Sequence, residues 1–385
     1  MKRRDFLKLC MVTASTRLYA APAAGSRFLL VFLRGGYDAA NVLVPASSGF
    51  YHEARPNIAV SQDSALKIDA DWALHPALRD TVFSLYRKGE AAFVPFAGTD
   101  DLTRSHFETQ DSIELGQPLG RGRNYQSGFL SRLVSVLEAP HPISFTDQLP
   151  IVFRGDTQVP NMALKTIGRS NVDARQSSLI AQMYRGNPLG AQVNEGFAVR
   201  DEVRRDMTDE MEAASRNAIS SKGFETEARR IAKLMKEPFN LGFVDVGGWD
   251  THVGEGGAKG YLAGRLEELG RGLAAFAEEL GPAWRDTVVV VLSEFGRTFR
   301  ENGNRGTDHG HGSVYWVLGG AVQGGSVRGE QVAVQQSTLF QNRDYPVINE
   351  YRALLGGLFA RTYGLDRGAL ERIFPGVKPQ DLGLA

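Results

Sequence analysis

The sequence predicts an α/β fold in the form of a three-layer α/β/α sandwich with a mostly parallel sheet. Apolar runs typical of buried strands alternate along the chain with segments that have helical spacing. The clearest strands, residues 28–33 and 288–292, are apolar without a break, as expected where helices cover both faces of a sheet. Lys plus Arg and Asp plus Glu both number 44, so the formal net charge is zero and nothing favours nucleic acid or an anionic membrane as a partner.

The N-terminus has a pattern typical of export. Residues 2–8, KRRDFLK, resemble a twin-arginine signal, and Ala-Pro-Ala at 21–23 offers a small-residue cleavage site. The apolar run between them is far shorter than the roughly 20 residues that span a bilayer, and no later run is long enough either. We therefore expect residues 1–23 to be a signal peptide and residues 24–385 to form one domain that is periplasmic or secreted. The only cysteine, Cys10, lies in this signal, which leaves no thiol for a disulfide or a metal site.

The remaining elements alternate in the order that an α/β fold requires. A strand at 28–33, a helical pattern at 74–87 and a strand at 91–96 form one predicted β-α-β unit, after which a helix begins near Ser105. The region from about 154 to 239 differs, because its second half is charged and helix-prone; we expect a peripheral helical section there, either a solvated outer helix or part of a lid. The alternation then resumes with a strand at 241–246, a helix at 261–280, strands at 288–292 and 314–318, and a helix at 350–363.

The most informative stretch, LSEFGRTFRENGNRGTDHGHG at 292–312, directly follows the valine-rich strand. It offers Glu294, Arg297, Asp308, His309 and His311 in a glycine-rich setting. Open α/β proteins keep their chemistry just past the carboxyl ends of buried strands, so these side chains predict a metal site. The alternative is a set of hydrogen-bonded loop residues that hold no metal.

Two further candidate ligand positions follow other strands. Asp250 and His252 come after a glycine pair, and in an extended segment both would point toward one ion. Asp38 ends the first strand and could bind a divalent metal with help from Asn41, or it could cap the following turn or helix. A mixture of carboxylates and imidazoles suits Zn²⁺, Mn²⁺ or iron better than Ca²⁺.

Ser105 opens the helix after the second predicted strand. A helix N-terminus favours a bound phosphate or sulfate, so Ser105 could be a nucleophile, with Thr103 as a weaker candidate and Arg104 as a clamp for an anionic group. However, Ser105 and Glu108 also form a capping-box pattern, which requires nothing beyond helix initiation. His106 could be a metal ligand or a residue that supports one.

Taken together, the motifs RGGYDAANVLVP, RSHFETQD, GGWDTH, SEFGRTFREN, GTDHGHG and NEYRALLGGLF resemble domain-of-unknown-function family 1501. The resemblance runs from about Phe28 to Pro375. It implies an alkaline phosphatase-like fold, related to enzymes that hydrolyse phosphate or sulfate esters at a metal site, although the family's own activity is not established.

Carried over position by position, the resemblance implies a ligand set and a nucleophile. It makes Asp38, Asp250, His252 and Glu294 metal ligands, together with His309 or His311. It also places Ser105 or Thr103 at the nucleophile position, with Arg104 or Arg297 stabilising charge on the reacting group.

Phe295 departs from the pattern of the alkaline phosphatase and sulfatase superfamily, to which the resemblance points, because a histidine ligand is common at this position. A phenylalanine cannot bind metal, and two hypotheses follow. In the first, the protein is an exported metal-dependent hydrolase that contains Zn²⁺ or Mn²⁺ and acts on a small anionic phosphate or sulfate ester. In the second, it is a non-catalytic protein that binds or assembles with an unknown periplasmic partner.

Overall fold

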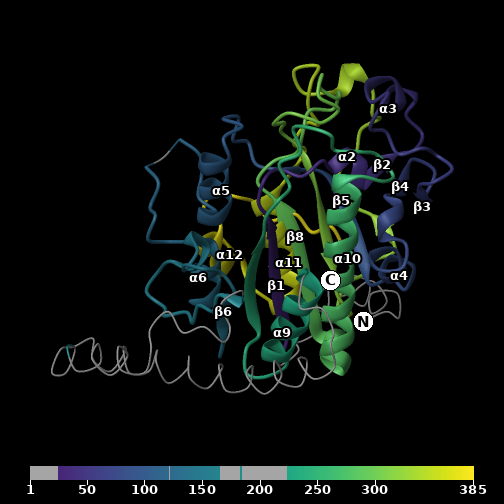
Figure 1. Ribbon diagram of the computed structural model, residues 1–385. Helices are drawn as coiled ribbons and strands as arrows, with labels where there is room; N and C mark the ends of the chain where they lie inside the picture. The colour runs from purple at the N-terminus through teal and green to yellow at the C-terminus, as the bar shows by residue number, and fades with distance from the viewer. Residues whose placement is uncertain (1–24, 121, 165–182, 184–222) are drawn as a thin grey trace, which may run out of the picture.

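The computed structural model describes residues 25–120, 122–164, 183 and 223–385, and it is built on an eight-stranded sheet (Figure 1). The strands of this sheet are β1 (Arg27–Leu33), β5 (Ala91–Gly98), β6 (Pro142–Ser144), β7 (Leu241–Val246), β8 (Thr287–Ser293), β9 (Ser313–Leu318), β10 (Ser326–Val327) and β11 (Asn349–Glu350). Their order is β10-β5-β9-β8-β1-β7-β6, and β11 pairs with β5 beyond the end of β10. Only the pairings of β9 with β5 and β8 are antiparallel, so the mostly parallel sheet predicted from the sequence is confirmed.

The reversed direction of β9 determines where the functional loops meet. Parallel strands β1, β5, β7 and β8 end at the same edge of the sheet, and β9 begins there because it runs the opposite way. The segments that follow β1, β5, β7 and β8 and the segment that precedes β9 therefore gather at one edge. Ligands bind at this carboxyl edge in open α/β sheets.

Helices cover both faces of the sheet. The α-helices are α2 (Ala39–Val42), α3 (Gly49–Ala54), α4 (Val82–Arg87), α5 (His106–Leu115), α6 (Phe129–Val134), α9 (Phe224–Lys236), α10 (Tyr261–Leu280), α11 (Tyr351–Tyr363) and α12 (Arg367–Ile373). Short 3-10 helices lie at Pro76–Leu78, Ile151–Phe153, Gly281–Asp286 and Gln336–Thr338, and a small second sheet consists of β2 (Leu43–Pro45), β4 (Trp72–Leu74) and β3 (Leu66–Lys67).

The alternation of side chains in β1 shows the three layers directly. Leu29 and Val31 belong to a core cluster that includes the apolar faces of α9 and α10. Leu30 and Phe32 point to the other face and join a second cluster formed with α6, α11 and α12. Both faces are buried, which explains why the strand is apolar at every position after Arg27. The α/β/α sandwich is therefore confirmed.

Most predicted elements match the structure closely, but one expectation is wrong. The helical pattern at 74–87 contains the end of β4, a 3-10 turn that begins at Pro76, and only then α4. Proline disfavours a helical conformation for the residue before it, so His75 stays extended and the helix begins late. Strands β1 and β5 run parallel, as the predicted β-α-β unit requires, and β8 and β9 lie between them in the sheet.

Some expectations fall outside the described residues. The signal peptide expected at 1–23 and most of the helical section expected at about 154–239 lie there. The described part of that section includes α9, whose residues Phe224, Ile231 and Met235 are buried, so α9 belongs to the helical layer beside α10 (Figure 1). Within the described residues, no helix combines the length and the apolar character needed to cross a membrane.

Candidate metal centre

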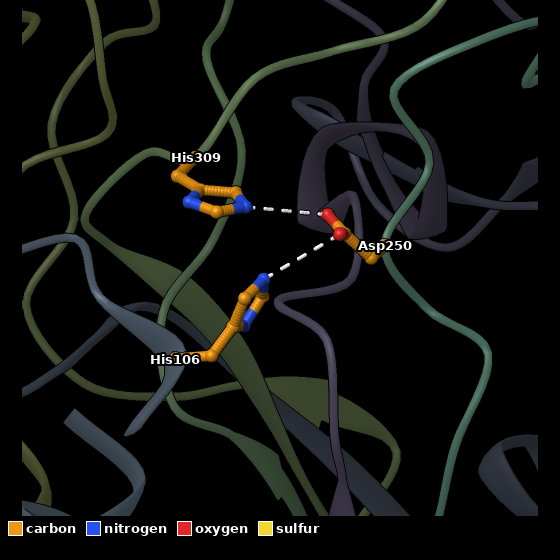
Figure 2. Close-up of side chains that lie close together, drawn as sticks. All are labelled: His106, Asp250 and His309. Carbon is orange, nitrogen blue, oxygen red and sulfur yellow. Dashed lines mark ion pairs between the residues drawn. The ribbon is translucent and has the colours of Figure 1, made fainter. Parts of the chain in front are cut away.

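Three side chains from separate parts of the chain converge at the carboxyl edge of the sheet. His106 is the first residue of α5, Asp250 follows β7, and His309 precedes β9, and Figure 2 shows both imidazoles directed at the carboxylate. The Nε2 atom of His106 lies 3.6 Å from Oδ2 of Asp250, and Nε2 of His309 lies 3.3 Å from Oδ1. One ligand atom from each residue lies within 4.8 Å of the other two.

His252 adds a third imidazole to this group. Its Nε2 atom lies 2.9 Å from Oδ1 of Asp250 and 3.1 Å from Nε2 of His309. The side chain is 40% exposed, so it lies on the solvent side of the cluster. Four side chains thus direct nitrogen or oxygen atoms toward one position.

The hydrogen bonds on the far side of each imidazole determine which nitrogen is available. Nδ1 of His106 lies 2.7 Å from a carboxylate oxygen of Glu294, and Nδ1 of His309 lies 3.0 Å from the carbonyl oxygen of Arg104. Nδ1 of His252 lies 3.3 Å from Oδ1 of Asp308. Because all three partners are acceptors, each Nδ1 donates its proton to its partner, and a ring that is neutral presents a lone pair at Nε2.

Three lone pairs and a carboxylate facing one another repel unless a cation or protons lie between them. In the structure the buried Nε2 atom of His106 has no hydrogen-bond partner. Donor atoms in a tetrahedral zinc site with bonds of 2.0–2.1 Å lie about 3.3 Å apart. The distances from the imidazoles to one or other oxygen of Asp250, and between His252 and His309, run from 2.9 to 3.6 Å, which is the spacing of donors around one ion. The residues therefore fit a divalent cation such as Zn²⁺.

The environment of His309 also suits a metal ligand. Burial lowers its pKa below the usual value, and the positive charge of Arg297, together with that of His106 when His106 is protonated, lowers it further. Metals bind the neutral form of imidazole, so a lowered pKa keeps the ring ready for binding. For His106, the hydrogen bond to Glu294 raises the pKa, which is the effect of a carboxylate that makes an imidazole more basic.

Glu294 supports His106 rather than reaching the centre of the cluster. Its carboxylate is buried, and its Oε1 accepts hydrogen bonds from Nδ1 of His106, from Nε2 of Gln110 at 2.8 Å and from the amide of Gly35 at 2.9 Å. The hydroxyl of Ser293 donates to Oε2 at 2.8 Å. Burial raises the pKa of Glu294, but the hydrogen bonds, with that from His106 the strongest, bring it below its usual value.

Arg297 holds Asp250 in place. Its side chain is fully buried, and Nη1 donates to Oδ1 of Asp250 at 2.6 Å. Nε and Nη2 donate to the hydroxyl and the carbonyl oxygen of Thr307, at 3.2 and 2.5 Å. Burial raises the pKa of Asp250, but Arg297 outweighs this effect and keeps the group ionised. A fully buried guanidinium is not placed to contact a substrate, so its contacts are those of a supporting residue.

Asp38 lies outside the cluster. Its buried carboxylate forms a two-point ion pair with Arg55, in which Nη2 donates to Oδ1 at 2.9 Å and Nη1 donates to Oδ2. Asn41 also binds Arg55, through its Oδ1 atom at 3.0 Å. A guanidinium therefore occupies the position beside Asp38 where the sequence suggested a metal ion.

Thr103, Arg104 and Ser105, the three residues before α5, each make different contacts. Ser105 caps the helix, since its hydroxyl accepts from the amide of Glu108 at 3.5 Å. Thr103 is exposed, and its Oγ1 lies 3.3 Å from Oγ1 of Thr109. Arg104 has a φ of 52°, a conformation that non-glycine residues rarely adopt, and its guanidinium binds Asp344 at 2.7 and 3.0 Å. This conformation presents its carbonyl oxygen to His309.

His311 and Phe295 have positions that the sequence did not reveal. His311 is buried and packs against Phe340, with ring centroids 5.0 Å apart, and it is not in the three-residue cluster. Phe295 is also buried, with its ring 5.0 Å from that of His106 and 5.2 Å from that of His309. A Cβ atom on Gly36 would meet the Phe295 ring at 2.4 Å, so the apolar ring fills the space beside the imidazoles.

Sequence reasoning left the role of His106 open and missed Arg55 entirely. The capping pattern at Ser105 contained a usable signal for His106, because it places this residue at the first helical position, at the sheet edge where ligands gather. The position of Arg55 after α3 gave no such indication, since its contact with Asp38 depends on how the segment after β1 folds back.

A separate cavity of about 400 Å³ lies along the same edge of the sheet, past β1, β6 and β7. Its lining includes Arg34, Glu114 and Asp245. Nη1 of Arg34 donates to Oε1 of Gln110 at 2.9 Å, and Gln110 in turn donates to Glu294. The cavity wall and the imidazole cluster are therefore connected by hydrogen bonds.

Comparisons with known proteins place this chain in a family. Two solved structures resemble it at 10% sequence identity: Ps i-CgsB in complex with k-i-k-neocarrahexaose, with a TM-score of 0.43 over 93% of this chain and 75% of the other, and the lipoteichoic acid synthase LtaP from Listeria monocytogenes, with a TM-score of 0.41 over 96% and 78%. No curated protein matches the sequence. The model of a family described as "Protein of unknown function (DUF1501)" matches residues 26–374, which confirms the resemblance drawn from the motifs. The chain belongs to the DUF1501 family.

Proposed function

We propose that this protein is an exported metal-dependent hydrolase of phosphate or sulfate esters. The observation that carries the proposal is the convergence of three Nε2 atoms on the carboxylate of Asp250, with each Nδ1 atom bonded to an acceptor. His106, Asp250, His252 and His309 would hold the ion, which Zn²⁺ or Mn²⁺ fits by the chemistry of the donors. A bound divalent cation would supply Lewis acidity and attract an anionic substrate.

The donor set itself is compatible with an anionic ester. Three neutral imidazoles and one carboxylate leave one positive charge of a bound divalent cation uncompensated at the ion, while Glu294 and Asp308 lie behind the imidazoles and Arg297 lies next to Asp250. Arg104 is the better candidate for contact with substrate, because its side chain is 24% exposed while Asp344 anchors it. We assign Arg104 to the substrate's anionic oxygens and Arg297 to the support of Asp250.

Ser105 is the proposed nucleophile. It is half-buried and directly precedes His106, and its capping contact is long. In the proposed reaction its oxygen bonds to phosphorus or sulfur while the bond to the alcohol oxygen breaks, and the alcohol leaves with the serine proton. Water then cleaves the seryl ester, which releases phosphate or sulfate and restores the hydroxyl.

Hydrolysis of 4-nitrophenyl phosphate and 4-nitrocatechol sulfate by the Zn²⁺- and Mn²⁺-loaded protein tests this activity. Ser105→Asn is the sharpest variant, because asparagine caps a helix as well as serine does but has no hydroxyl. We expect this variant to keep the wild-type unfolding temperature and to lose turnover. Ser105→Thr, which retains a hydroxyl, should keep the fold and part of the turnover. Full activity of Ser105→Asn would remove Ser105 from the mechanism.

The export proposal rests on the sequence of residues 2–8. Fractionation of bacterial cells that express the full chain should recover protein shortened near residue 23 from the periplasm. Replacement of Arg3 and Arg4 by lysine should retain the uncleaved chain in the cytoplasm. Export that persists in this variant would contradict the twin-arginine route.

A second candidate function is non-catalytic binding of a periplasmic partner. It is favoured by Phe295, which occupies the space beside both imidazoles, and by Arg55, which neutralises Asp38. Both features argue against a second metal ion in the site. A protein that binds one equivalent of metal, hydrolyses no ester and captures a periplasmic protein equally well after Ser105→Asn would support this function instead.

A further inference from the structure

Glu255 is a buried acid that contacts both loops of the candidate metal centre. Its side chain is fully buried, and its Oε2 atom accepts hydrogen bonds from the hydroxyls of Thr251 and Thr307, each at 2.9 Å. Thr251 lies between Asp250 and His252, and Thr307 lies two residues before His309. One carboxyl oxygen therefore connects the segment after β7 with the segment before β9.

We propose that Glu255 is a positioning residue that holds these two loops in the register that brings Asp250, His252 and His309 together. The inference rests on the proposed metal centre. Glu255 does not contact His106, Asp250, His252 or His309. It acts on their positions through its hydrogen bonds to Thr251 and Thr307.

The hydrogen bonds around Thr307 show that its hydroxyl is the donor in the contact with Glu255. Nε of Arg297 donates to the hydroxyl of Thr307 at 3.2 Å, so the hydroxyl's own hydrogen is free to point to Glu255. The same guanidinium donates to Asp250 through Nη1. Loss of the Glu255 acceptor would therefore release Thr307 and loosen the hold of Arg297 on Asp250.

The backbone of the two loops is paired at the same place. The amide of Thr307 donates to the carbonyl oxygen of Thr251 at 3.0 Å, and the amide of Glu255 donates to that of Arg305 at 2.9 Å. Gly306 allows this approach, since a Cβ atom there would lie 2.4 Å from the carbonyl carbon of His252. Glu255 supplies the buried side-chain contact within an interface that the backbone already brings close.

The opposite side of Glu255 faces Asp38. The two carboxyl groups hydrogen-bond to each other, and Asp38 is ion-paired with Arg55. Burial and the charge of Asp38 raise the pKa of Glu255 well above its usual value, while Arg55 keeps Asp38 ionised. When protonated, Glu255 can donate to Asp38 while its Oε2 atom accepts from the two threonines. Glutamine has the same shape, and its amide oxygen can accept from the threonines while its NH2 group donates to Asp38.

Binding of Co²⁺ to the metal-free protein, followed by its visible absorption, tests the inference. The band shape reports the geometry of the ligands and the titration gives the Kd. We expect Glu255→Gln to match the wild type in both. Glu255→Ala should bind about 10- to 100-fold more weakly, the loss typical of residues that orient ligands, and should show an altered band.

Single threonine variants keep the test decisive if Glu255→Ala fails to fold. Thr307→Val and Thr251→Val remove one hydroxyl each and should weaken Co²⁺ binding in the same direction. Thr287→Val is the matched control, because Thr287 is equally buried and donates to the carbonyl oxygen of Ala283 at 2.7 Å, at the start of β8, the end away from the site. Thermal unfolding of each metal-free variant separates loss of metal from loss of fold.

The outcomes separate this inference from the function on which it rests. Wild-type Co²⁺ binding that is unchanged in Glu255→Ala and Thr307→Val would overturn the positioning role alone. Equal weakening by Glu255→Gln and Glu255→Ala would overturn the neutral-acid contact. Failure of the wild type to bind Co²⁺ would overturn the metal centre and this inference with it.

Discussion

The carboxylate of Glu294 lies 2.7 Å from Nδ1 of His106 and thereby directs Nε2 of the same ring toward Asp250. This pairing turns a glutamate that the sequence suggested as a ligand into the support of another ligand. Carboxylate–histidine pairs of this kind fix both the orientation and the proton position of a metal-binding imidazole.

Glu294→Gln should weaken Zn²⁺ binding by about 10- to 100-fold, because it replaces a charged acceptor of His106 by a neutral amide. The Kd can be measured by competition with a chromophoric chelator. Glu350→Gln is the control, since Glu350 is a half-buried glutamate that caps α11 through the amide of Ala353. Equal affinity of the wild type and Glu294→Gln would show that the charge of Glu294 does not support metal binding through His106.

The two histidines of the GTDHGHG motif should behave differently. His309→Ala should lower Zn²⁺ affinity by at least about 100-fold, because losing a ligand costs at least as much as losing its support. His311→Ala should keep the wild-type Kd, since this ring packs on Phe340 outside the cluster. The same competition titration measures both variants, and a loss confined to His311→Ala would reverse the assignment.

His311 should make the fold sensitive to mild acid. Burial and the nearby charge of Arg104 lower the pKa of His311 from 6.5 to about 4. The unfolded chain therefore takes up a proton first as the pH falls. The contribution of neutral His311 to the free energy of unfolding is therefore fully present above about pH 6.5. It decreases as the pH falls toward 4, by up to roughly 3 kcal/mol over that interval.

Urea unfolding of the metal-free protein between pH 7 and pH 4 measures this effect. His311→Gln should have a flatter dependence of the unfolding free energy on pH than the wild type. Identical pH dependence of the two proteins would show that His311 does not carry the effect.

Asp38 and Arg55 should behave as a structural pair and not as part of the metal centre. Arg55→Met leaves Asp38 buried without a counter-charge and should cost about 3–5 kcal/mol, the loss typical of a broken buried ion pair. The double variant Asp38→Asn/Arg55→Met should recover part of this loss in urea unfolding. It should also bind Zn²⁺ in its folded state, and loss of metal from a folded Asp38→Asn variant would return Asp38 to the ligand set.

The fold could be predicted from the sequence because its signals are local. The uninterrupted apolar run of β1 and the valines of β8 require burial on both faces, and helix α10 has the bounds that its spacing predicted. The antiparallel direction of β9 was not visible, since it depends on the hairpin formed by residues 294–312.

The site was predictable only in part, because many of its contacts join segments that are distant in the sequence. Asp250, His252 and His309 follow or precede strands at the carboxyl edge, so their gathering could be expected from the topology. The partners of Asp38, Glu294 and His311 are contacts between segments distant in sequence, and residue type alone does not distinguish a ligand from the residue that holds it.

Anomalous diffraction at the zinc absorption edge, from crystals grown with Zn²⁺, tests the central claim most directly. We predict a peak about 2.0–2.1 Å from Nε2 of His106 and of His309, and at a similar distance from the carboxylate of Asp250. A peak at Asp38 or His311, or no peak beside Asp250 in protein saturated with Zn²⁺, would contradict the account.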